Sequence, residues 1–197
     1  NNFSFSFQKN KIFGIIGDSG RGKTTLLNLL LGNLFAQSGS VKIDEESLNE
    51  RTASEWQNKI GYLPQKIFLL DDTIIRNIAF GVEDINIDKK RINEVLKLSQ
   101  LETLSNTLNI DVDLLGENGN KLSGGQIQRI GLARSLYNNP SVLFFDEFTS
   151  ALDDKVEKEI LHDINKLKQN KTIFIISHKK SIIEFCDEII NLNTDTL

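Results

Sequence analysis

The apolar positions of this sequence form short continuous runs, separated by longer stretches in which they recur at helical spacing. Three runs are almost entirely apolar: residues 12–16, 142–145 and 172–176. Runs of this length are typical of strands that are buried on both faces of a parallel sheet. Residues 60–65 are predicted to form another strand, stopped by Pro64. Because residues 155–168 have the pattern of an amphipathic helix between two of these strands, the sequence predicts an α/β fold.

The first sixty residues carry weaker signals. Residues 3–7 alternate strictly between phenylalanine and serine, which predicts a strand with one buried face. Residues 41–43 are predicted to be a short strand after a turn at residues 38–40, and the polar stretch 47–59 is predicted to be a helix. Because the chain begins two residues before a predicted strand, we expect it to be a fragment whose first strands are absent.

The middle of the chain has a different pattern, with helical spacing and no clear strand. Residues 72–80 and 88–101 are predicted to be helices, and a further helix is predicted from Ser123 to Tyr137. We therefore expect a single domain over residues 1–197 with two lobes. Residues 1–66 and 137–197 would form the α/β core, and residues 67–136 an inserted helical subdomain.

Composition narrows the class of protein. The chain has 197 residues, 39% hydrophobic and 25% charged, which indicates one soluble globular domain and excludes a disordered chain. Its net charge of −4 argues against a nucleic-acid partner. Cys186 is the only cysteine, so an internal disulfide is excluded and a reducing compartment is favoured. We find no signal peptide and no apolar run long enough to cross a bilayer, so another polypeptide or segment would have to provide any membrane span.

A glycine-rich segment follows the strand predicted at residues 12–16. It fits the pattern G-x-x-x-x-G-K-[ST] and precedes a predicted helix over residues 25–31 that ends at Gly32. Strand, glycine loop and helix in this order aim backbone N–H groups at one point, which suits a polyanion. Lys23 would reach the β- and γ-phosphates of a nucleotide, and the Thr24 hydroxyl would bind Mg²⁺. The candidate phosphate-binding residues are Gly17, Asp18, Ser19, Gly20, Arg21, Gly22, Lys23, Thr24 and Thr25.

Two adjacent carboxylates end the strand predicted at residues 142–145. Asp146 is placed to hold Mg²⁺, and Glu147 to orient or deprotonate an attacking water. The alternative is an acidic pair that only stabilises the N-terminus of a following helix. The phosphate-binding loop favours the catalytic interpretation.

A second predicted anion-binding helix end lies at residues 122–126, with the sequence LSGGQ. Ser123 is a good N-cap, and Gly124 and Gly125 expose backbone N–H groups. The helical region separates this end from the phosphate-binding loop, so the two cannot easily hold the same γ-phosphate within one chain.

Together these motifs resemble the nucleotide-binding domain of an ATP-binding cassette (ABC) protein. The resemblance rests on residues 17–24, Gln65, 122–126, 142–147, 150–153 and His178, and it covers residues 3 to 191. It implies an ATPase that uses ATP and Mg²⁺, with a phosphate-loop NTPase core and a helical subdomain. It also implies two cassettes, identical or different, that stack head to tail when ATP binds. Each ATP then lies between the phosphate loop of one chain and the signature residues of the other, here Ser123, Gly124, Gly125 and Gln126.

The same resemblance gives roles to three more residues. Gln65 matches the glutamine that contacts Mg²⁺ and the attacking water, and Asp153 the aspartate that couples the two sites of the dimer. His178 matches the histidine that contacts the γ-phosphate. His162 lies in a predicted helix without a motif and is interpreted as structural or solvent-facing, and Cys186 as a small buried residue.

The branch of the family is predicted from two segments. Residues 116–119 resemble the loop of exporter-type cassettes that contacts the membrane domain, and residues 64–74 resemble the segment that receives its cytoplasmic coupling helices. The family usually has arginine where Asn118 stands and a small residue where Arg21 stands. The aromatic residue that stacks on adenine in the family has no counterpart here, so weak nucleotide affinity is expected.

The predicted function is therefore an ATPase domain on the cytoplasmic face of a membrane that powers an exporter or a lipid flippase. Two alternatives stay open: a soluble ATPase acting on chromosomes or ribosomes, and an importer subunit. The interval between the phosphate loop and the signature lacks the sustained heptads of chromosome-type members. Ribosome-type members have two cassettes in one chain, whereas this chain has one.

Overall fold

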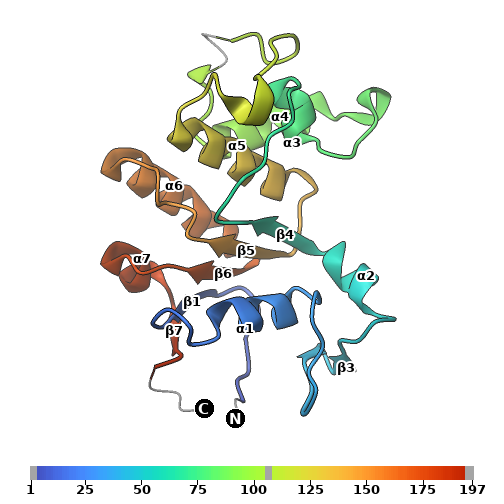
Figure 1. The fold of residues 1–197 in the computed structure, drawn as a ribbon, viewed down its shortest axis with the longest axis vertical. Coiled ribbons are helices and arrows are strands. Elements are labelled where there is room, and N and C mark those ends of the chain that lie inside the picture. Colours follow the sequence, from blue (N-terminus) through green and yellow to red (C-terminus); the bar gives the residue numbers. More distant parts are fainter. Residues whose placement is uncertain (1–3, 105–107, 194–197) are drawn as a thin grey trace.

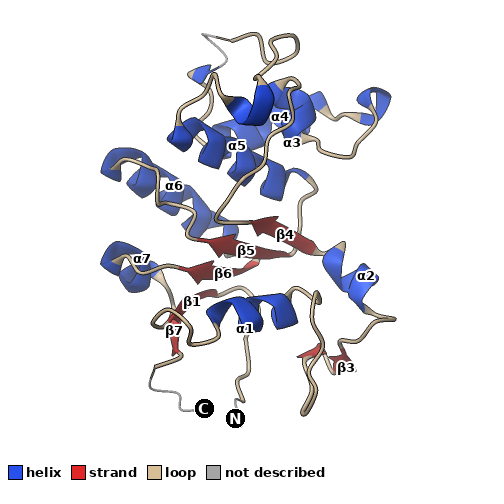
Figure 2. Ribbon diagram, viewed as in Figure 1, coloured by secondary structure: helices blue, strands red, loops and turns tan. Residues whose placement is uncertain are grey.

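The computed structural model describes residues 4–104 and 108–193. A five-stranded sheet with strand order β4-β5-β6-β1-β7 forms the centre of the molecule, and every neighbouring pair in it is parallel (Figure 2). The strands are β1 (Ile12–Ile16), β4 (Ile60–Leu63), β5 (Val142–Asp146), β6 (Thr172–Ile176) and β7 (Glu188–Asn191). The α/β prediction is confirmed: this is a mostly parallel sheet with flanking helices.

The helices lie in separate groups around the sheet. Figure 1 shows α3 (Ile74–Ile78), α4 (Lys89–Leu98) and α5 (Gly124–Tyr137) together beyond the β4 edge. The remaining helices are α1 (Lys23–Leu30), α2 (Ala53–Gln57), α6 (Asp154–Leu167) and α7 (Lys180–Phe185), with short 3₁₀ turns η1 (Asp84–Asn86) and η3 (Glu117–Gly119). A small antiparallel pair joins β2 (Lys42–Ile43) to β3 (Glu46–Ser47). Among its described residues, the region 67–136 holds helices and no strand.

The sheet has a separate hydrophobic core on each of its faces, which explains the continuous apolar runs of its central strands. Phe144 and Phe174 stack with ring centroids 4.7 Å apart on the face that packs against α1. Their neighbours Phe145 and Ile175 point to the opposite face and pack with α5 and α6. Because successive side chains of a strand point to opposite faces, a strand covered on both sides must be apolar at every position.

Helix α5 lies unusually close to the sheet edge. A Cβ atom on Gly61 of β4 would lie 2.1 Å from the carbonyl oxygen of Ser135, so only glycine fits there. A Cβ on Gly131 of α5 would lie 2.8 Å from Cδ1 of Leu63. These two glycines let the helix that begins at the signature pack directly against the core strand β4.

Two predicted elements differ from the structure. Residues 4–7 of the strand predicted over residues 3–7 are not a strand, and Phe3 lies outside the described residues. The Phe7 ring packs instead against Phe13 and Phe174, with centroids 5.0 and 4.9 Å away, so the buried face of the pattern arises from aromatic packing.

The helix predicted over residues 47–59 is also wrong for most of its length, because only Ala53–Gln57 is helical. Asn49 and Thr52 accept backbone hydrogen bonds with their side chains, from the amides of Arg51 and Asn49. Such local bonds compete with helix formation and hold residues 49–52 in a turn. Among the described residues, no helix is long and apolar enough to cross a membrane.

Candidate functional site

The first candidate site is a cleft of about 350 Å³ at the carboxyl ends of the parallel strands. The glycine-rich loop follows β1, and Gln65 follows β4. Asp146 is the last residue of β5, Glu147 comes directly after it, and His178 follows β6. The cleft is lined by Ser19, Gly20, Gly22, Lys23, Thr24, Thr25, Gln65, Asp146, Glu147, Ile176 and His178. Ten of these eleven residues were predicted, and they come from four segments that lie far apart in the sequence; Ile176 was not predicted.

The loop wraps around the amino group of Lys23. Lys23 Nζ donates to the carbonyl oxygens of Gly17 at 2.5 Å and Asp18 at 2.8 Å. Gly20 and Gly22 have φ values of 81° and 91°, and a Cβ at either position would meet no atom within 4 Å. The glycines are therefore needed for the left-handed backbone and not for space. The N-terminal turn of α1 begins at Lys23, so its free N–H groups face the cleft region.

The carboxylates have unlike surroundings. Burial and the neighbouring Glu147 raise the pKa of Asp146, and Lys23 partly opposes that rise. Glu147 has a φ of 50°, a left-handed conformation that costs energy for a residue with a side chain. Its amide donates to the carbonyl oxygen of Ile176 at 2.9 Å, which holds this conformation. His178 Nε2 lies 3.3 Å from Glu147 Oε1, so a carboxylate and an imidazole meet at one side of the cleft.

The second candidate site is a cleft of about 370 Å³ around the N-terminus of α5. It is lined by Ser123, Gly124, Gly125, Arg129, Ala151, Leu152, Asp153 and Val156. Ser123 caps α5: its hydroxyl accepts from the Gln126 amide at 3.3 Å, and its own amide donates to Gln126 Oε1 at 2.7 Å. Gln126 is thus bound within the capping box and does not line the cleft.

Asp153 and Arg129 are the charged residues of the second cleft. Asp153 is the N-cap of α6, where hydrogen bonds from the Val156 and Lys155 amides hold the pKa of Asp153 below its ordinary value. Arg129 was not predicted, although it lies four residues after Gly125 on the predicted helix and so had to face the same side. It donates to the carbonyl oxygens of Gly125 and Gln100.

The two clefts share no lining residue. Four predicted residues line neither of them: Gly17, Asp18, Arg21 and Gln126. Of these, Gly17 and Asp18 support the loop through their carbonyl oxygens, whereas the Arg21 side chain is exposed. The chain therefore has two separate clefts that are lined by different groups.

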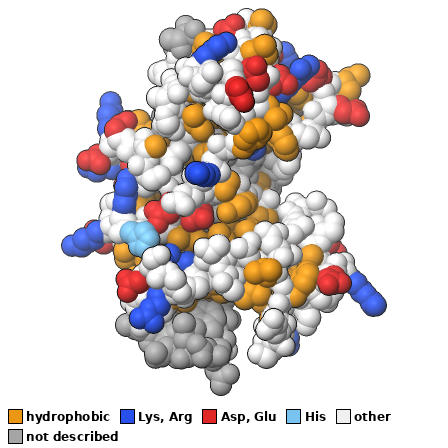
Figure 3. Space-filling model, viewed as in Figure 1, with side chains coloured by type: hydrophobic (Ala, Val, Ile, Leu, Met, Phe, Trp, Pro, Cys, Tyr) orange, Lys and Arg blue, Asp and Glu red, His pale blue; other side chains and the backbone are white. Residues whose placement is uncertain are grey.

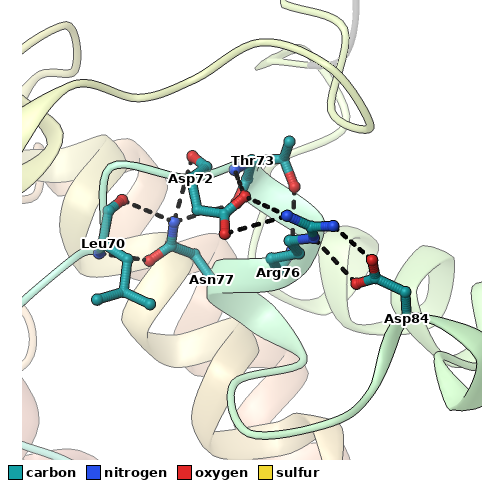
Figure 4. A network of polar contacts seen from close by, with 6 residues as sticks. All are labelled: Leu70, Asp72, Thr73, Arg76, Asn77 and Asp84. Atoms are coloured by element: carbon teal, nitrogen blue, oxygen red, sulfur yellow. Dashed lines mark hydrogen bonds and ion pairs between the residues drawn. The ribbon is translucent and has the colours of Figure 1, made fainter.

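The segment that follows Gln65 is held by a polar network (Figure 4). The buried Asn77 side chain accepts from the Leu70 amide at 2.9 Å and donates to the carbonyl oxygens of Leu70 and Thr73. Arg134 of α5 donates to the carbonyl oxygens of Asn77 and Phe68.

These bonds fix the backbone of the segment, whose Phe68 and Leu70 side chains lie at the surface whereas Leu69 and Ile74 are buried. Phe68 is 63% exposed, and Phe80, which lies over the Arg134 guanidinium, is 54% exposed. Figure 3 shows hydrophobic side chains at the surface where the molecule narrows between its helices and its sheet. The predicted docking segment at residues 64–74 thus includes exposed apolar side chains on a fixed backbone.

The family model, the related sequences and the solved structure that match this chain all indicate the same family. A family model described as ABC transporter matches residues 1–150. A putative export ATP-binding/permease protein of Rickettsia typhi is 38% identical over 96% of this chain, and the ATP-dependent lipid A-core flippase of Ralstonia nicotianae is 37% identical over 92%. A solved bacterial Atm1-family ABC exporter with ATP bound is 33% identical over 92% of the chain, with a TM-score of 0.85. The chain spans about a third of the length of each of these proteins.

Proposed function

This chain belongs to the ABC transporter family, and from that premise we propose that it binds and hydrolyses ATP to power a membrane exporter. The observation that carries the proposal is the first cleft, where one lysine, two carboxylates and one histidine meet a glycine loop. Phosphoryl transfer to water needs three kinds of group: a cation, N–H donors for the phosphates, and a base for the water.

The triphosphate would lie along the loop. Residues 17–25 would bind it through backbone N–H groups and hydroxyls, and Lys23 would exchange its bonds to Gly17 and Asp18 for the β- and γ-phosphates. Both accepting carbonyls belong to the loop, so the amino group is already held close to the place where a phosphate would bind.

Oxygen donors for Mg²⁺ lie in the same cleft. Thr24, Gln65 and Asp146 offer a hydroxyl, an amide oxygen and a carboxylate, and Mg²⁺ prefers oxygen ligands. The raised pKa of Asp146 supports the assignment, because a half-buried carboxylate beside a second one lacks a full counter-charge. When bound, Mg²⁺ would neutralise charge that develops on the phosphates.

We assign the chemistry to Glu147 and His178. Glu147 would accept a proton from the attacking water or hold it in line, and His178 would contact the γ-phosphate. Their 3.3 Å contact keeps both groups on one side of the cleft. Gln65 would complete the set by contacting the water and the metal ion.

The second cleft would complete the site of another chain. Ser123, Gly124, Gly125 and Gln126 would bind the ATP held by the loop of a second cassette, and Asp153 would couple the two sites. Because the clefts share no residue, two chains stacked head to tail are the arrangement that uses both. ATP would then drive dimerisation, because it makes its full set of contacts only in the assembled dimer.

The exporter assignment is supported by the relatives, whose names describe export, permease and lipid A-core flippase proteins. We propose that the chain is the part of such a protein at the cytoplasmic face of the membrane. Residues 1–66 and 137–197 would be its ATPase core, and residues 67–136 a helical subdomain that receives cytoplasmic coupling helices. The names give less support to a chromosome, ribosome or importer ATPase.

The test is ATP turnover by the purified chain. With Mg²⁺ and ATP, we expect phosphate release whose specific rate rises with protein concentration, and a dimer in light scattering only when ATP is present. Removal of Mg²⁺ with a chelator should stop phosphate release. A chain that neither binds nor hydrolyses ATP at any concentration would contradict the proposal.

A further inference from the structure

An ion pair between the buried Glu157 carboxylate and the partly exposed Lys179 joins α6 to the loop that carries His178. Glu157 is only 5% exposed; Lys179 Nζ lies 2.6 Å from its Oε2, and Ser181 donates to its Oε1 at 2.9 Å. Burial alone would raise the pKa of Glu157, but hydrogen bonds from Lys179, Ser181 and Thr149 outweigh it and hold this pKa below its ordinary value. The Glu157 carboxylate is therefore ionised near neutral pH, and its oxygens are hydrogen-bonded.

The same ammonium group holds a third segment. Lys179 Nζ donates to the carbonyl oxygen of Thr149 at 2.8 Å. That carbonyl also accepts from the Leu152 amide at 3.2 Å, which closes a turn between Glu147 and Asp153. Lys179 thus connects its own loop, helix α6 and the turn at residues 149–151.

Helix α5 holds this turn from another direction. Gln128 donates to the Ser150 hydroxyl at 2.8 Å and accepts from the Ala151 amide at 3.1 Å. Gln128 is buried, and it belongs to the helix whose N-terminus forms the second cleft. The 149–151 turn is therefore fixed between a residue near the first cleft and a residue of the helix that forms the second.

The placement of His178 depends on its two neighbours. Ser177 is buried, and its hydroxyl accepts from the Lys179 amide at 3.2 Å. The Lys179 side chain is held by Glu157 and Thr149, whereas the His178 side chain is 60% exposed. A fixed backbone limits the positions that an exposed imidazole can reach, and here the bonds that fix it come from the residue next to it.

We propose that Lys179, paired with Glu157, is a positioning residue that sets His178 against Glu147 and ties this geometry to α5 through the 149–151 turn. The proposal rests on the ATPase function proposed above. Lys179 lines neither cleft, so it acts on turnover only through the residues that it holds.

The test compares Lys179→Met, which keeps chain length and removes the charge, with Lys179→Arg, which keeps a cation. In Lys179→Met we expect kcat to fall about 10- to 100-fold, with KM for ATP changed less than about two-fold, because a misplaced group slows chemistry more than binding. Lys179→Arg should recover most of kcat. Adding Glu157→Gln to Lys179→Met should lower kcat little further, since the pair is already broken.

The matched control is Lys168→Met. Lys168 pairs with Asp187 at 2.8 Å and also joins α6 to the α7 region, but at the opposite end of α6. This variant loses an ion pair of the same kind and should keep the parental kcat. Should Lys179→Met fail to fold, Glu157→Gln breaks the same pair and takes its place in the comparison.

A second readout does not depend on ATP turnover. The chain has two histidines, and His162 lies exposed on α6 as an internal reference. In proton NMR spectra, the Hε1 signal of His178 should shift in Lys179→Met while that of His162 stays in place. Parental kcat together with an unchanged His178 signal in Lys179→Met would overturn the proposal. A parental chain without ATPase activity would instead contradict the proposed function, and the His178 signal would still decide this one.

Discussion

The two clefts of this chain have nearly the same volume but contain different chemical groups. The first combines a lysine, two carboxylates and a histidine with a glycine loop. The second offers a capped helix end, two glycines and an arginine, and its aspartate is already bound to backbone amides. Groups that can move a proton or place a water molecule lie in the first cleft. The second has donors that can hold an anion.

The two clefts also differ in backbone strain. Glu147 in the first cleft keeps a left-handed backbone and lies beside a carboxyl group with a raised pKa. Ser123 in the second cleft has an ordinary extended conformation and a complete capping box. The second cleft also holds a perturbed group, because backbone hydrogen bonds lower the pKa of Asp153. The first cleft, however, combines a perturbed pKa with a strained backbone, as sites of chemistry often do. We therefore expect substitutions in the first cleft to affect turnover or binding directly, and substitutions in the second to act through assembly.

The largest expected effect is that of Glu147→Gln. The amide keeps the shape of the side chain but cannot accept a proton, so turnover should fall about 10²- to 10⁴-fold while ATP binding is kept. Phosphate release and calorimetric titration with ATP measure the two quantities. Glu159→Gln, on the exposed side of α6, is the control and should behave as the parent. Turnover within a few-fold of the parent would remove Glu147 from this role.

A smaller effect is expected for Lys23→Ala. Loss of a charged hydrogen-bond donor to the phosphates should weaken ATP binding about 10- to 100-fold. Lys42→Ala, an exposed lysine on β2, is the control. Because Lys23 also holds the loop through Gly17 and Asp18, circular dichroism should accompany the titration. An unchanged affinity in a folded variant would contradict the phosphate assignment.

The smallest effect concerns stability. The pKa of Asp146 is raised in the folded chain, so the ionised carboxylate costs stability above that pKa and costs nothing well below it. Without nucleotide or Mg²⁺, Asp146→Asn should raise Tm at neutral pH by a small amount, on the order of 2–4 °C. The gain should vanish below the ordinary aspartate pKa of about 3.9. Thermal unfolding across pH measures this, and a gain that persists in acid would exclude the charge as its cause.

Much of this arrangement could be predicted from the sequence because local patterns determined it. The strands β1, β5 and β6 are apolar on both faces, and the order of loop, strand end and helix cap fixes where Lys23, Asp146 and Ser123 must lie. The strand β7 and the helix α7 were not predicted. Both are short, and β7 forms only through its pairing with β1, a contact distant in sequence.

Other features had a misleading local signal or none. Phe5 and Phe7, ahead of β1, pack as aromatic rings and do not pair as a strand. The cluster of Glu157, Lys179 and Thr149 joins three segments that the sequence separates, so only the folded chain brings them together. From the sequence we expected the phosphate loop and the signature to lie apart within one chain. The two clefts share no lining residue, which agrees with that expectation.

The central claim is that the second cleft serves a partner chain, and a mixture of two variants tests it most directly. The Lys23→Ala variant has an intact signature at residues 122–126, and the Ser123→Arg variant has an intact phosphate loop. Mixed in equal amounts, they can form a dimer with one intact composite site, so turnover should exceed that of either variant alone. It should approach on the order of a quarter of the parental rate if the sites act independently. Parental turnover by Ser123→Arg alone, as a monomer at every protein concentration, would place the whole active site in one chain and contradict the account.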